Sequence, residues 1–408
     1  MNQSFNNLTY IENQYSELKS KGLDLDLTRG KPHSGQLDLT NNLDGILSGS
    51  CNFEDLDIRN YGEIKGLRGC RELGAKILEC PVEYVIAAGN SSLTLMSQYL
   101  MSLFLHGSGK GPWLSYDRVS FLCPVPGYDR HFKLCEEFGI NMIPIPLTGN
   151  GPDISYVKKI VKKDPSIQGI WCVPKHSNPT GDIYSKECIE GLLEVCQLAK
   201  RDFKILWDNA YAVHDFYPSQ PLPDIFKIAG KSNSLESVIA FASTSKITFA
   251  GGGVSFIAMS ERNLDIFLKH YSSITIGPDK VNQARHIMFF KGYEDLLIHM
   301  KKHAEILRPK FEIVEKWLSL QNYGSWTKPS GGYFVSFNTN PGLAKETIQL
   351  ASEVGLKLTP AGSTYPYGVD PHDENIRIAP TACSEIELEE AMETFVLCVA
   401  LAALRRKV

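Results

Sequence analysis

The chain lacks the features of a membrane protein and of a nucleic-acid-binding protein. No stretch of its 408 residues is long and apolar enough to span a bilayer. The first ten residues lack the apolar core of a secretory signal. Lysine and arginine number 42 against 46 acidic residues, so the net charge is −4 and the basic excess typical of nucleic-acid binding is absent. We therefore expect a cytoplasmic protein with no membrane or nucleic-acid partner.

Paired cysteines are also missing. The chain has ten cysteines, and no two of them form a Cys-x-x-Cys motif. Scattered single thiols, most of them in apolar or helical surroundings, are typical of reduced cysteines in a cytoplasmic protein. We therefore expect neither disulfides nor a metal site. Internal repeats, low-complexity segments and long charge runs are absent as well.

What the chain does have is a globular composition and a regular alternation of segments in its middle part. Hydrophobic residues make up 43% of the chain and charged residues 22%, which permits a large core. Short apolar runs alternate with amphipathic stretches, and this predicts a mainly parallel sheet covered by helices on both faces. The seven expected strands are 84–88, 113–115, 141–145, 169–173, 205–208, 238–243 and 254–259.

The pattern changes after residue 291. A long helix is expected over 293–319, then strands at 333–337 and 376–379 with a helix between them, and a terminal helix from Ser384. The first fifty or so residues lack a core of their own, so we expect them to pack against this second region. We predict a large domain of residues 50–291 and a smaller α+β domain formed by residues 1–49 and 292–408.

Polar residues follow several of the expected strands, at the sheet edge where open parallel sheets bind ligands. Residues 89–92, Gly-Asn-Ser-Ser, precede a helix. Their small side chains and the free N–H groups of the helix suit a phosphate, although they also suit a plain helix cap. Residues 174–181 form a turn by their chemistry, and Asn178 in this turn could donate a hydrogen bond into the crevice.

Asp208 and Lys246 carry the most chemistry. Asp208 ends an apolar strand, where a carboxylate needs a cationic partner, and Tyr211 is close enough in sequence to reach the same ligand. Lys246 follows two serines at the end of another apolar run. It is either a solvated lysine or an amine that forms an imine with a carbonyl cofactor. The order of these residues along the strand ends favours the second interpretation.

Together the motifs resemble the fold-type I pyridoxal-phosphate enzymes, the aspartate aminotransferase superfamily. The resemblance covers nearly the whole chain and rests on residues 89–92, 178–181, 208–211 and 243–246 and on Arg377 in Ile-Arg-Ile-Ala. The phrasing of residues 28–32, 124–131 and 243–251 is similar to a divergent bacterial subgroup described as aspartate aminotransferases. The resemblance implies an α/β fold with a seven-stranded, mainly parallel sheet in a large domain and a smaller α+β domain.

This resemblance implies a role for each motif. Lys246 would hold pyridoxal 5′-phosphate as a Schiff base and move a proton at the substrate Cα. Asp208 would keep the pyridine nitrogen protonated, while Asn178 and Tyr211 would hydrogen-bond the phenolic oxygen. Arg377, with Asn178 nearby, would pair with the substrate α-carboxylate, which suits a planar guanidinium. The phosphate would be held by Asn90, Ser91, Ser92, Ser243 and Ser245.

The chain departs from the family pattern at two positions. Val254 stands where most relatives carry a phosphate-binding arginine. The motif that ends at Tyr128 is one residue shorter than usual, and Tyr128 is still the candidate for stacking on the cofactor ring. Tyr61 matches the tyrosine with which relatives reach the phosphate of the neighbouring subunit. A homodimer with shared active sites is therefore implied.

The substrate side chain is the least specified part of the site. Relatives that act on dicarboxylates use an arginine for the distal carboxylate, and none aligns here because residues 272–280 contain no arginine. The candidates are Arg29, Lys280 and Arg285. Arg29, with Gly30 beside it, lies near a segment that lines the substrate site in relatives, so it is preferred.

The resemblance implies an aminotransferase acting on amino acids and 2-oxo acids. The expected reaction is that of an aspartate aminotransferase, which converts L-aspartate and 2-oxoglutarate to oxaloacetate and L-glutamate by a ping-pong mechanism. A β-elimination lyase would use the same Schiff base and stays open as an alternative. A regulatory sensor with an aminotransferase-like domain would need a winged helix, and only about twenty residues precede Leu23, so we do not expect it.

Overall fold

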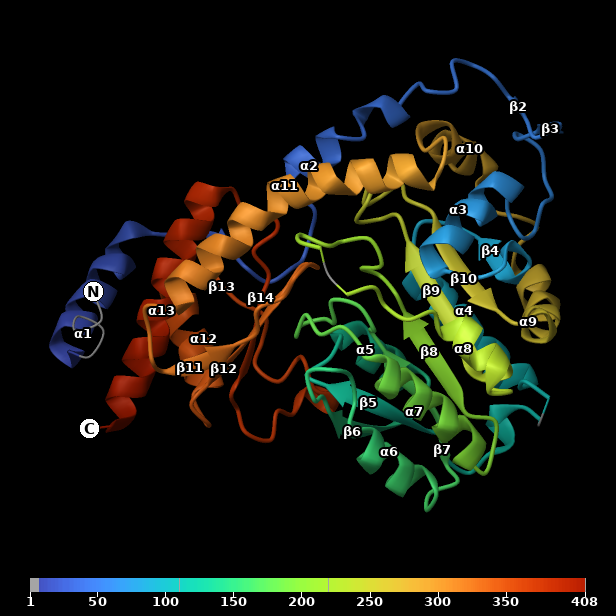
Figure 1. The fold of residues 1–408 in the computed structure, drawn as a ribbon. Helices are drawn as coiled ribbons and strands as arrows, with labels where there is room; N and C mark the ends of the chain where they lie inside the picture. The colour runs from blue at the N-terminus through green and yellow to red at the C-terminus, as the bar shows by residue number, and fades with distance from the viewer. Residues whose placement is uncertain (1–6, 110, 219, 408) are drawn as a thin grey trace.

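A seven-stranded sheet forms the centre of one part of the molecule, on the right in Figure 1. The computed structural model describes residues 7–109, 111–218 and 220–407. The strand order is β4-β10-β9-β8-β7-β5-β6, and all neighbours are parallel except β10, which is antiparallel to β4 and β9. The predicted sheet type is therefore confirmed. The strands are β4 (Val85–Ala87), β5 (Ser120–Val125), β6 (Asn141–Pro146), β7 (Ile167–Cys172), β8 (Lys204–Asp208), β9 (Val238–Ser243) and β10 (Ser255–Met259).

Helices cover both faces of this sheet, as strands buried on two sides require. Every residue of β7 and β8 is buried, which explains why these strands are nearly continuous apolar runs. One face packs on α3 (Arg68–Leu78), α6 (Ile154–Val161), α7 (Lys186–Leu198), α8 (Ile225–Lys231) and α10 (Lys280–Phe289). The other face packs on α4 (Ser92–His106), α5 (Asp129–Glu137) and α9 (Glu261–Ile274).

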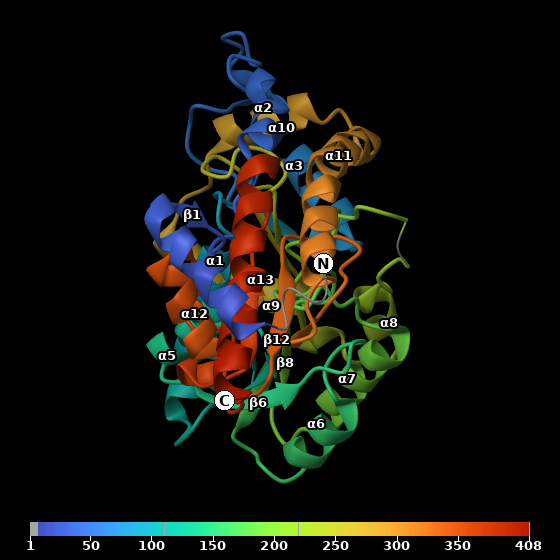
Figure 2. The same cartoon turned by 90° about the vertical axis from the view of Figure 1, so that its left-hand side faces the viewer.

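A second apolar core joins the two ends of the chain (Figure 2). Its helices α1, α11, α12 and α13 pack around the antiparallel sheet β11-β12-β14, and β1 pairs in parallel with β13. The exact domain boundaries stay a prediction. The elements are α1 (Leu8–Lys21), β1 (Leu25–Asp26), α11 (Tyr293–Leu318), β11 (Gly324–Trp326), β12 (Val335–Thr339), α12 (Ala344–Glu353), β13 (Leu356–Lys357), β14 (Asn375–Ile378) and α13 (Glu385–Lys407).

Local sequence signals explain the ends of several elements. α13 follows a capping box, in which the Ser384 hydroxyl accepts a hydrogen bond from the Glu387 N–H at 3.2 Å and the Glu387 carboxylate accepts one from the Ser384 N–H at 2.8 Å. The helix expected from Ser384 therefore begins as predicted. Short elements link the two cores, namely α2 (Ser34–Asp38), β2 (Asn52–Phe53) and β3 (Leu56–Asp57).

One predicted strand is wrong. Residues Trp113–Ser115 form a single 3-10 turn after Pro112, and the strand of the sheet is β5, which the sequence analysis did not predict. The apolar signal at Trp113 comes from packing, because its ring meets that of Phe121 at 5.7 Å. β5 was hidden by Pro124, which is unusual inside a sheet. Its pairing with β7 ends at Leu122, so Pro124 lies where only β6 continues beside it.

The described ranges also bear on membranes, metals and thiols. In residues 7–109, 111–218 and 220–407, no helix is long and apolar enough to cross a membrane. The same residues contain no group of three or more histidine, cysteine or acidic side chains arranged to hold a metal ion. All ten cysteines are free, and seven of them are buried.

Candidate active site

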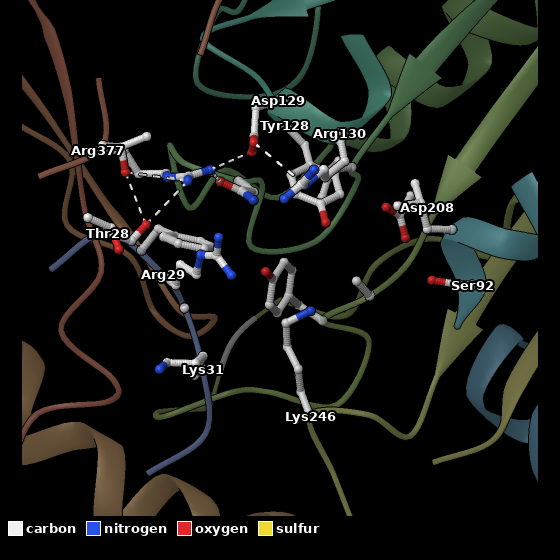
Figure 3. Close-up of a pocket in the computed structure, with 18 of the residues that line it drawn as sticks. Thr28, Arg29, Lys31, Ser92, Tyr128, Asp129, Arg130, Asp208, Lys246 and Arg377 are labelled. Atoms are coloured by element: carbon white, nitrogen blue, oxygen red, sulfur yellow. Dashed lines mark hydrogen bonds and ion pairs between the residues drawn. The ribbon is translucent and has the colours of Figure 1, made fainter. Parts of the chain in front are cut away.

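A cavity of about 530 Å³ lies at the carboxyl ends of β7, β8 and β9, facing β14 and the segment after β1 (Figure 3). Residues from both cores line it, so the cavity exists only because the two parts of the chain meet there. Nine of the residues singled out from the sequence line this cavity: Arg29, Gly30, Ser92, Tyr128, Asn178, Asp208, Tyr211, Lys246 and Arg377.

Lys246 rises from the loop after β9 and points into the cavity (Figure 3). Its ammonium nitrogen lies 5.0 Å from the centre of the Tyr211 ring. Burial lowers the pKa of this amine, while the carboxylate of Asp208 acts in the opposite direction. An amine with a lowered pKa is deprotonated more readily and is a better nucleophile.

The backbone of Lys246 is held from behind. The Tyr333 hydroxyl donates to its carbonyl oxygen at 3.3 Å, and the His214 Nε2 lies 3.4 Å from the same oxygen. Burial lowers the pKa of His214 well below its usual value, so this ring is neutral and its Nε2 carries the proton that it donates. These contacts fix the point from which the lysine side chain extends.

Asp208 is the last residue of β8 and is 3% exposed. Its Oδ2 lies 3.0 Å from the Nε2 of His131, whose ring stacks on Trp171 at 4.1 Å. Its Oδ1 is buried and has no hydrogen-bond partner within the described chain. A buried carboxylate oxygen without a donor is costly, so this atom is suited to a cationic or N–H group of a bound molecule. His131 was part of the quoted segment 124–131, but sequence reasoning gave it no role.

Tyr128 and Tyr211 place two phenols beside these groups. Tyr128 makes an edge contact with the His131 ring at 5.0 Å, and burial raises its pKa to about 12. Tyr211 is 2% exposed, and burial raises its pKa well above the usual value. Both phenols therefore stay protonated at neutral pH and are available as hydrogen-bond donors.

The predicted phosphate cradle is only partly in the cavity. Ser92, the first residue of α4, lines the cavity, whereas Ser91 caps the helix by accepting from the Thr94 N–H. Asn90 is held to the loop before β10, which contains three consecutive glycines at 251–253, because its Nδ2 donates to the Gly251 carbonyl at 3.0 Å. The structure thus shows the helix cap at Ser91, while a phosphate-binding role for Ser92 stays a prediction.

Ser243 and Ser245 brace this region rather than line the cavity. The Ser245 hydroxyl donates to the Asn90 carbonyl at 2.6 Å, and the Ser243 hydroxyl accepts from the Ser245 N–H at 3.3 Å. Val254 is 1% exposed and packs in the apolar core under the sheet. The position at which relatives carry an arginine therefore points away from the cavity.

At the opposite end of the cavity, Arg377 projects from β14 and is 7% exposed. Its Nη1 lies 3.0 Å from the Oδ1 of Asp129 and 3.4 Å from the Oδ1 of Asn178, and its guanidinium lies over the Phe334 ring at 4.9 Å. Sequence reasoning missed Asp129 and Phe334. Phe334 carries no motif signal, and Asp129 lies within residues 124–131 but was given no role, because its partner depends on how the two cores meet.

Further cations line the cavity near Arg377. Figure 3 shows the Arg29 side chain directed into the cavity, while the Lys31 ammonium points away from its centre. Arg130 lies 3.9 Å from Asp129 through its Nε. Gly30 allows this loop to approach closely, because a Cβ at this position would lie 2.6 Å from the Phe334 ring. Lys31 and Arg130 were not predicted.

Three candidates lie elsewhere. Lys280 is 5% exposed and donates to the Asn60 carbonyl at 2.7 Å and the Gly62 carbonyl at 3.0 Å. Its charge is therefore used to hold the loop that carries Tyr61. Tyr61 itself is 84% exposed, and neither it nor Arg285 is among the described residues that line this cavity.

Comparison with known proteins identifies the group to which this arrangement belongs. The family model described as aspartate amino-transferase matches residues 2–408. The chain belongs to the aspartate aminotransferase family. It is 42% identical over 405 residues to an aspartate aminotransferase of Corynebacterium glutamicum. This alignment covers 96% of this chain and 93% of the relative. The resemblance inferred from the motifs is confirmed.

Solved structures of this family agree in fold. The crystal structure of an aspartate transaminase from Corynebacterium glutamicum matches with a TM-score of 0.94 and 40% identity, over 98% of this chain and 96% of that one. An α-aminoadipate aminotransferase from Thermus thermophilus matches with a TM-score of 0.76 and 20% identity, over 97% of this chain and 96% of that one, which shows the fold alone. The family and its structural neighbours make this protein an aminotransferase with the fold-type I architecture.

Proposed function

We propose that the protein is a pyridoxal-phosphate-dependent aspartate aminotransferase, transferring an amino group from L-aspartate to 2-oxoglutarate. The observation that carries this proposal is the placement of Lys246 in one cavity between the unpartnered Oδ1 of Asp208 and the guanidinium of Arg377. A carbonyl cofactor and a carboxylate substrate need groups of these types at opposite ends of the site. The name of the 42% identical relative supports the substrate.

The residues present fit the cofactor. Asp208 offers a protonated ring nitrogen a buried oxygen that has no partner among the described residues. Ser92 and the N-terminus of α4 offer N–H groups and a favourable dipole to a phosphate. Tyr211 and Asn178 would meet the phenolic oxygen. When bound, pyridoxal phosphate supplies a reactive carbonyl carbon and a ring that accepts electrons from the substrate.

The remaining chemistry belongs to the side chains. Arg377 would hold the substrate α-carboxylate and thereby orient the Cα–H bond toward Lys246. The Lys246 amine would then take the proton from the substrate Cα. It would return this proton to the cofactor carbon that receives the amino group. General base catalysis of this kind contributes about 10²–10⁴-fold to a rate. Because one cavity would serve both substrates in turn, and the bound cofactor would retain the amino group between them, the mechanism would be ping-pong.

Arg29 is our proposed partner for the distal carboxylate. Five cationic and two acidic side chains line the cavity, which favours substrates with two negative charges. Three of these cations have no role assigned above. Arg29 points into the cavity, Lys31 points away, and Arg130 lies beside Asp129. An arginine also matches the planar shape of a carboxylate.

The test is a pair of half-reactions on the purified holoenzyme. Aspartate should bleach the imine absorption band, 2-oxoglutarate should restore it, and borohydride should fix the cofactor on Lys246, as located by peptide mapping. Bleaching without restoration, with release of pyruvate or ammonia, would favour the β-elimination lyase instead. A label on another residue, or no label, would remove the central claim.

We also propose that the enzyme is a cytoplasmic homodimer in which Tyr61 serves the site of the second subunit. Tyr61 is largely exposed, and Ile274 and Ile276 nearby in the fold are 47% and 64% exposed. Lys280 joins the two segments through the carbonyls of Asn60 and Gly62. An exposed aromatic and two exposed isoleucines are typical of a surface that another subunit covers.

A further inference from the structure

The proposed substrate-binding arginine already has a carboxylate partner within its own chain. Asp129 Oδ1 lies 3.0 Å from the Nη1 of Arg377, and the two side chains are 29% and 7% exposed. Asp129 is the first residue of α5, directly after Tyr128, and so comes from the opposite core to Arg377. Figure 3 shows this ion pair at the edge of the cavity where the substrate carboxylate would bind.

The geometry of Arg377 leaves a substrate little choice of approach. A carboxylate pairs best with two donors of a guanidinium. The Nε of Arg377 is buried and has no partner within the described chain, so a carboxylate that enters from the cavity meets the two terminal nitrogens first. The pair formed by Nη1 and Nη2 remains, and Nη2 makes only long contacts to the Thr28 carbonyl at 3.4 Å and the Thr359 hydroxyl at 3.5 Å. Asp129 therefore occupies one of the two nitrogens that a substrate carboxylate needs.

A second guanidinium, that of Arg130, lies close enough to pair with the Asp129 carboxylate when a substrate displaces it from Arg377. The Oδ2 of Asp129 lies 3.9 Å from the Nε of Arg130, whose side chain is 52% exposed. A modest rotation of Asp129 would exchange one guanidinium for the other. The acidic side chain would then keep a cationic partner at the rim of the cavity, where water also solvates it.

We propose that Asp129 is a specificity-determining residue, a built-in carboxylate that occupies Arg377 in the empty site and moves to Arg130 when the substrate α-carboxylate enters. The proposal rests on the proposed role of Arg377. Its consequence is that Asp129 weakens the binding of every ligand that must displace it. Ligands whose carboxylate makes a strong charge-assisted contact with Arg377 displace Asp129 and bind, and ligands without a carboxylate do not displace it.

The experiment measures the dissociation constant of maleate, an unreactive dicarboxylate, on the holoenzyme by absorbance titration and calorimetry. Asp129→Asn keeps the shape and removes the competing charge, so we expect about tenfold tighter binding. Asp153→Asn, at the cap of α6 and outside the described cavity lining, removes the same charge elsewhere and should leave the constant unchanged. Unchanged or weaker binding by Asp129→Asn would overturn the proposal.

Two further variants, Arg377→Gln and Arg130→Gln, are each combined with Asp129→Asn. They separate competition between Asp129 and the ligand for Arg377 from a general electrostatic effect of the Asp129 charge. In Arg377→Gln, competition predicts that Asp129→Asn no longer tightens maleate binding, whereas a field effect would persist and contradict the proposal. If Arg377→Gln alone leaves maleate binding unchanged, the proposed role of Arg377 fails, which is a separate result. Arg130→Gln should weaken binding only while Asp129 is present. An equal effect in both backgrounds would show that Arg130 contacts the ligand directly and that it does not receive Asp129.

Discussion

Individual residues to which the sequence motifs assigned no role hold the two charged ends of the cavity in place. His131 lies 3.0 Å from one oxygen of Asp208, which orients the carboxylate and leaves the other oxygen with no partner in the part of the chain that the structure describes. Phe334 lies beneath Arg377 at 4.9 Å and limits the positions of its guanidinium. The motif residues supply the reactive groups, and these neighbours determine how the groups are oriented in the cavity.

A change at Gly30 tests how closely the substrate loop must approach. In Gly30→Ala the new methyl group would meet the Phe334 ring at 2.6 Å, so either the loop or the ring must shift away from Arg377. We expect KM for aspartate to rise roughly tenfold with a smaller change in kcat, because substrate binding is disturbed more than proton transfer. Steady-state kinetics measures this.

The control for this change is Gly230→Ala. Gly230 lies in α8, and no atom of the described residues lies within 4 Å of an added methyl group. Alanine is favoured over glycine in a helix, so the kinetics of this variant should match the parent enzyme. If Gly30→Ala also behaves like the parent, the close approach is not needed for substrate binding.

At the scale of elements, α11 connects the two cores and carries part of the support for the lysine loop (Figure 1). His299 on this helix lies 2.8 Å from the Ile247 carbonyl, and His303 follows one turn later. Gln36 in α2 donates to both His303 and the Tyr333 hydroxyl. Elements far apart in sequence thus meet behind Lys246.

Replacing Gln36 by leucine should destabilise this junction. Gln36 is fully buried, and its amide donates to His303 Nδ1 at 2.9 Å and to the Tyr333 hydroxyl at 3.0 Å. Gln36→Leu leaves both acceptors buried without donors, which costs about 1–3 kcal/mol of unfolding free energy. Chemical denaturation measures the loss. Gln349→Leu, at an exposed site on α12, should change stability by less than about 0.5 kcal/mol.

Lys310 on α11 gives a prediction for pH. Its ammonium donates to the carbonyls of Thr381 and Cys383 at 2.9 and 2.5 Å, and burial lowers its pKa to about 8. Between this value and the ordinary pKa, the unfolded chain binds the proton and the folded chain releases it. The unfolding free energy of the parent protein should therefore rise with pH relative to Lys310→Met, by on the order of 3 kcal/mol over about pH 8 to 10.5.

The pH experiment compares denaturation curves of the two proteins at several pH values. The variant lacks the titrating amine, so the difference between the curves isolates the lysine from the tyrosines and cysteines that titrate in the same range. A difference that stays flat or falls with pH would show that the ammonium is not desolvated in the folded protein.

For the whole molecule, the main prediction is that two copies of the chain form a homodimer through a surface that includes Ile276. Ile276 belongs to the exposed apolar group that includes Tyr61 and Ile274. Ile276→Asp places a charge in the proposed interface, so the enzyme should elute as a 45.5 kDa monomer and lose most of its activity, since Tyr61 could no longer reach a second site. Light scattering on a sizing column and activity assays test this.

Ile386→Asp is the matched control. Ile386 is 85% exposed in the first turn of α13, where an acidic side chain suits the helix dipole. This variant should keep the mass and activity of the parent enzyme. If Ile276→Asp keeps them as well, the dimer surface lies elsewhere or the enzyme acts as a monomer.

Much of the fold could be predicted because its signals are local. Buried parallel strands appear as apolar runs between amphipathic helices, and Ser384 with Glu387 marks the start of α13. In the seven-stranded sheet the exception was β5, since Pro124 breaks the strand signal and the apolar Trp113, which packs on Phe121, gives a false one. A proline is tolerated there only because of which strands are neighbours, and that is a tertiary property.

The sequence by itself determined the family, the sheet and the groups that carry the proposed chemistry, because Asn178, Asp208 and Lys246 lie at or after the ends of strands that share one edge of the sheet. Only the tertiary structure decided what those groups meet. It joined Asp208 to His131, set Asp129 against Arg377, and directed Val254 into the apolar core. These contacts unite segments tens to hundreds of residues apart, and no local pattern encodes such a distance.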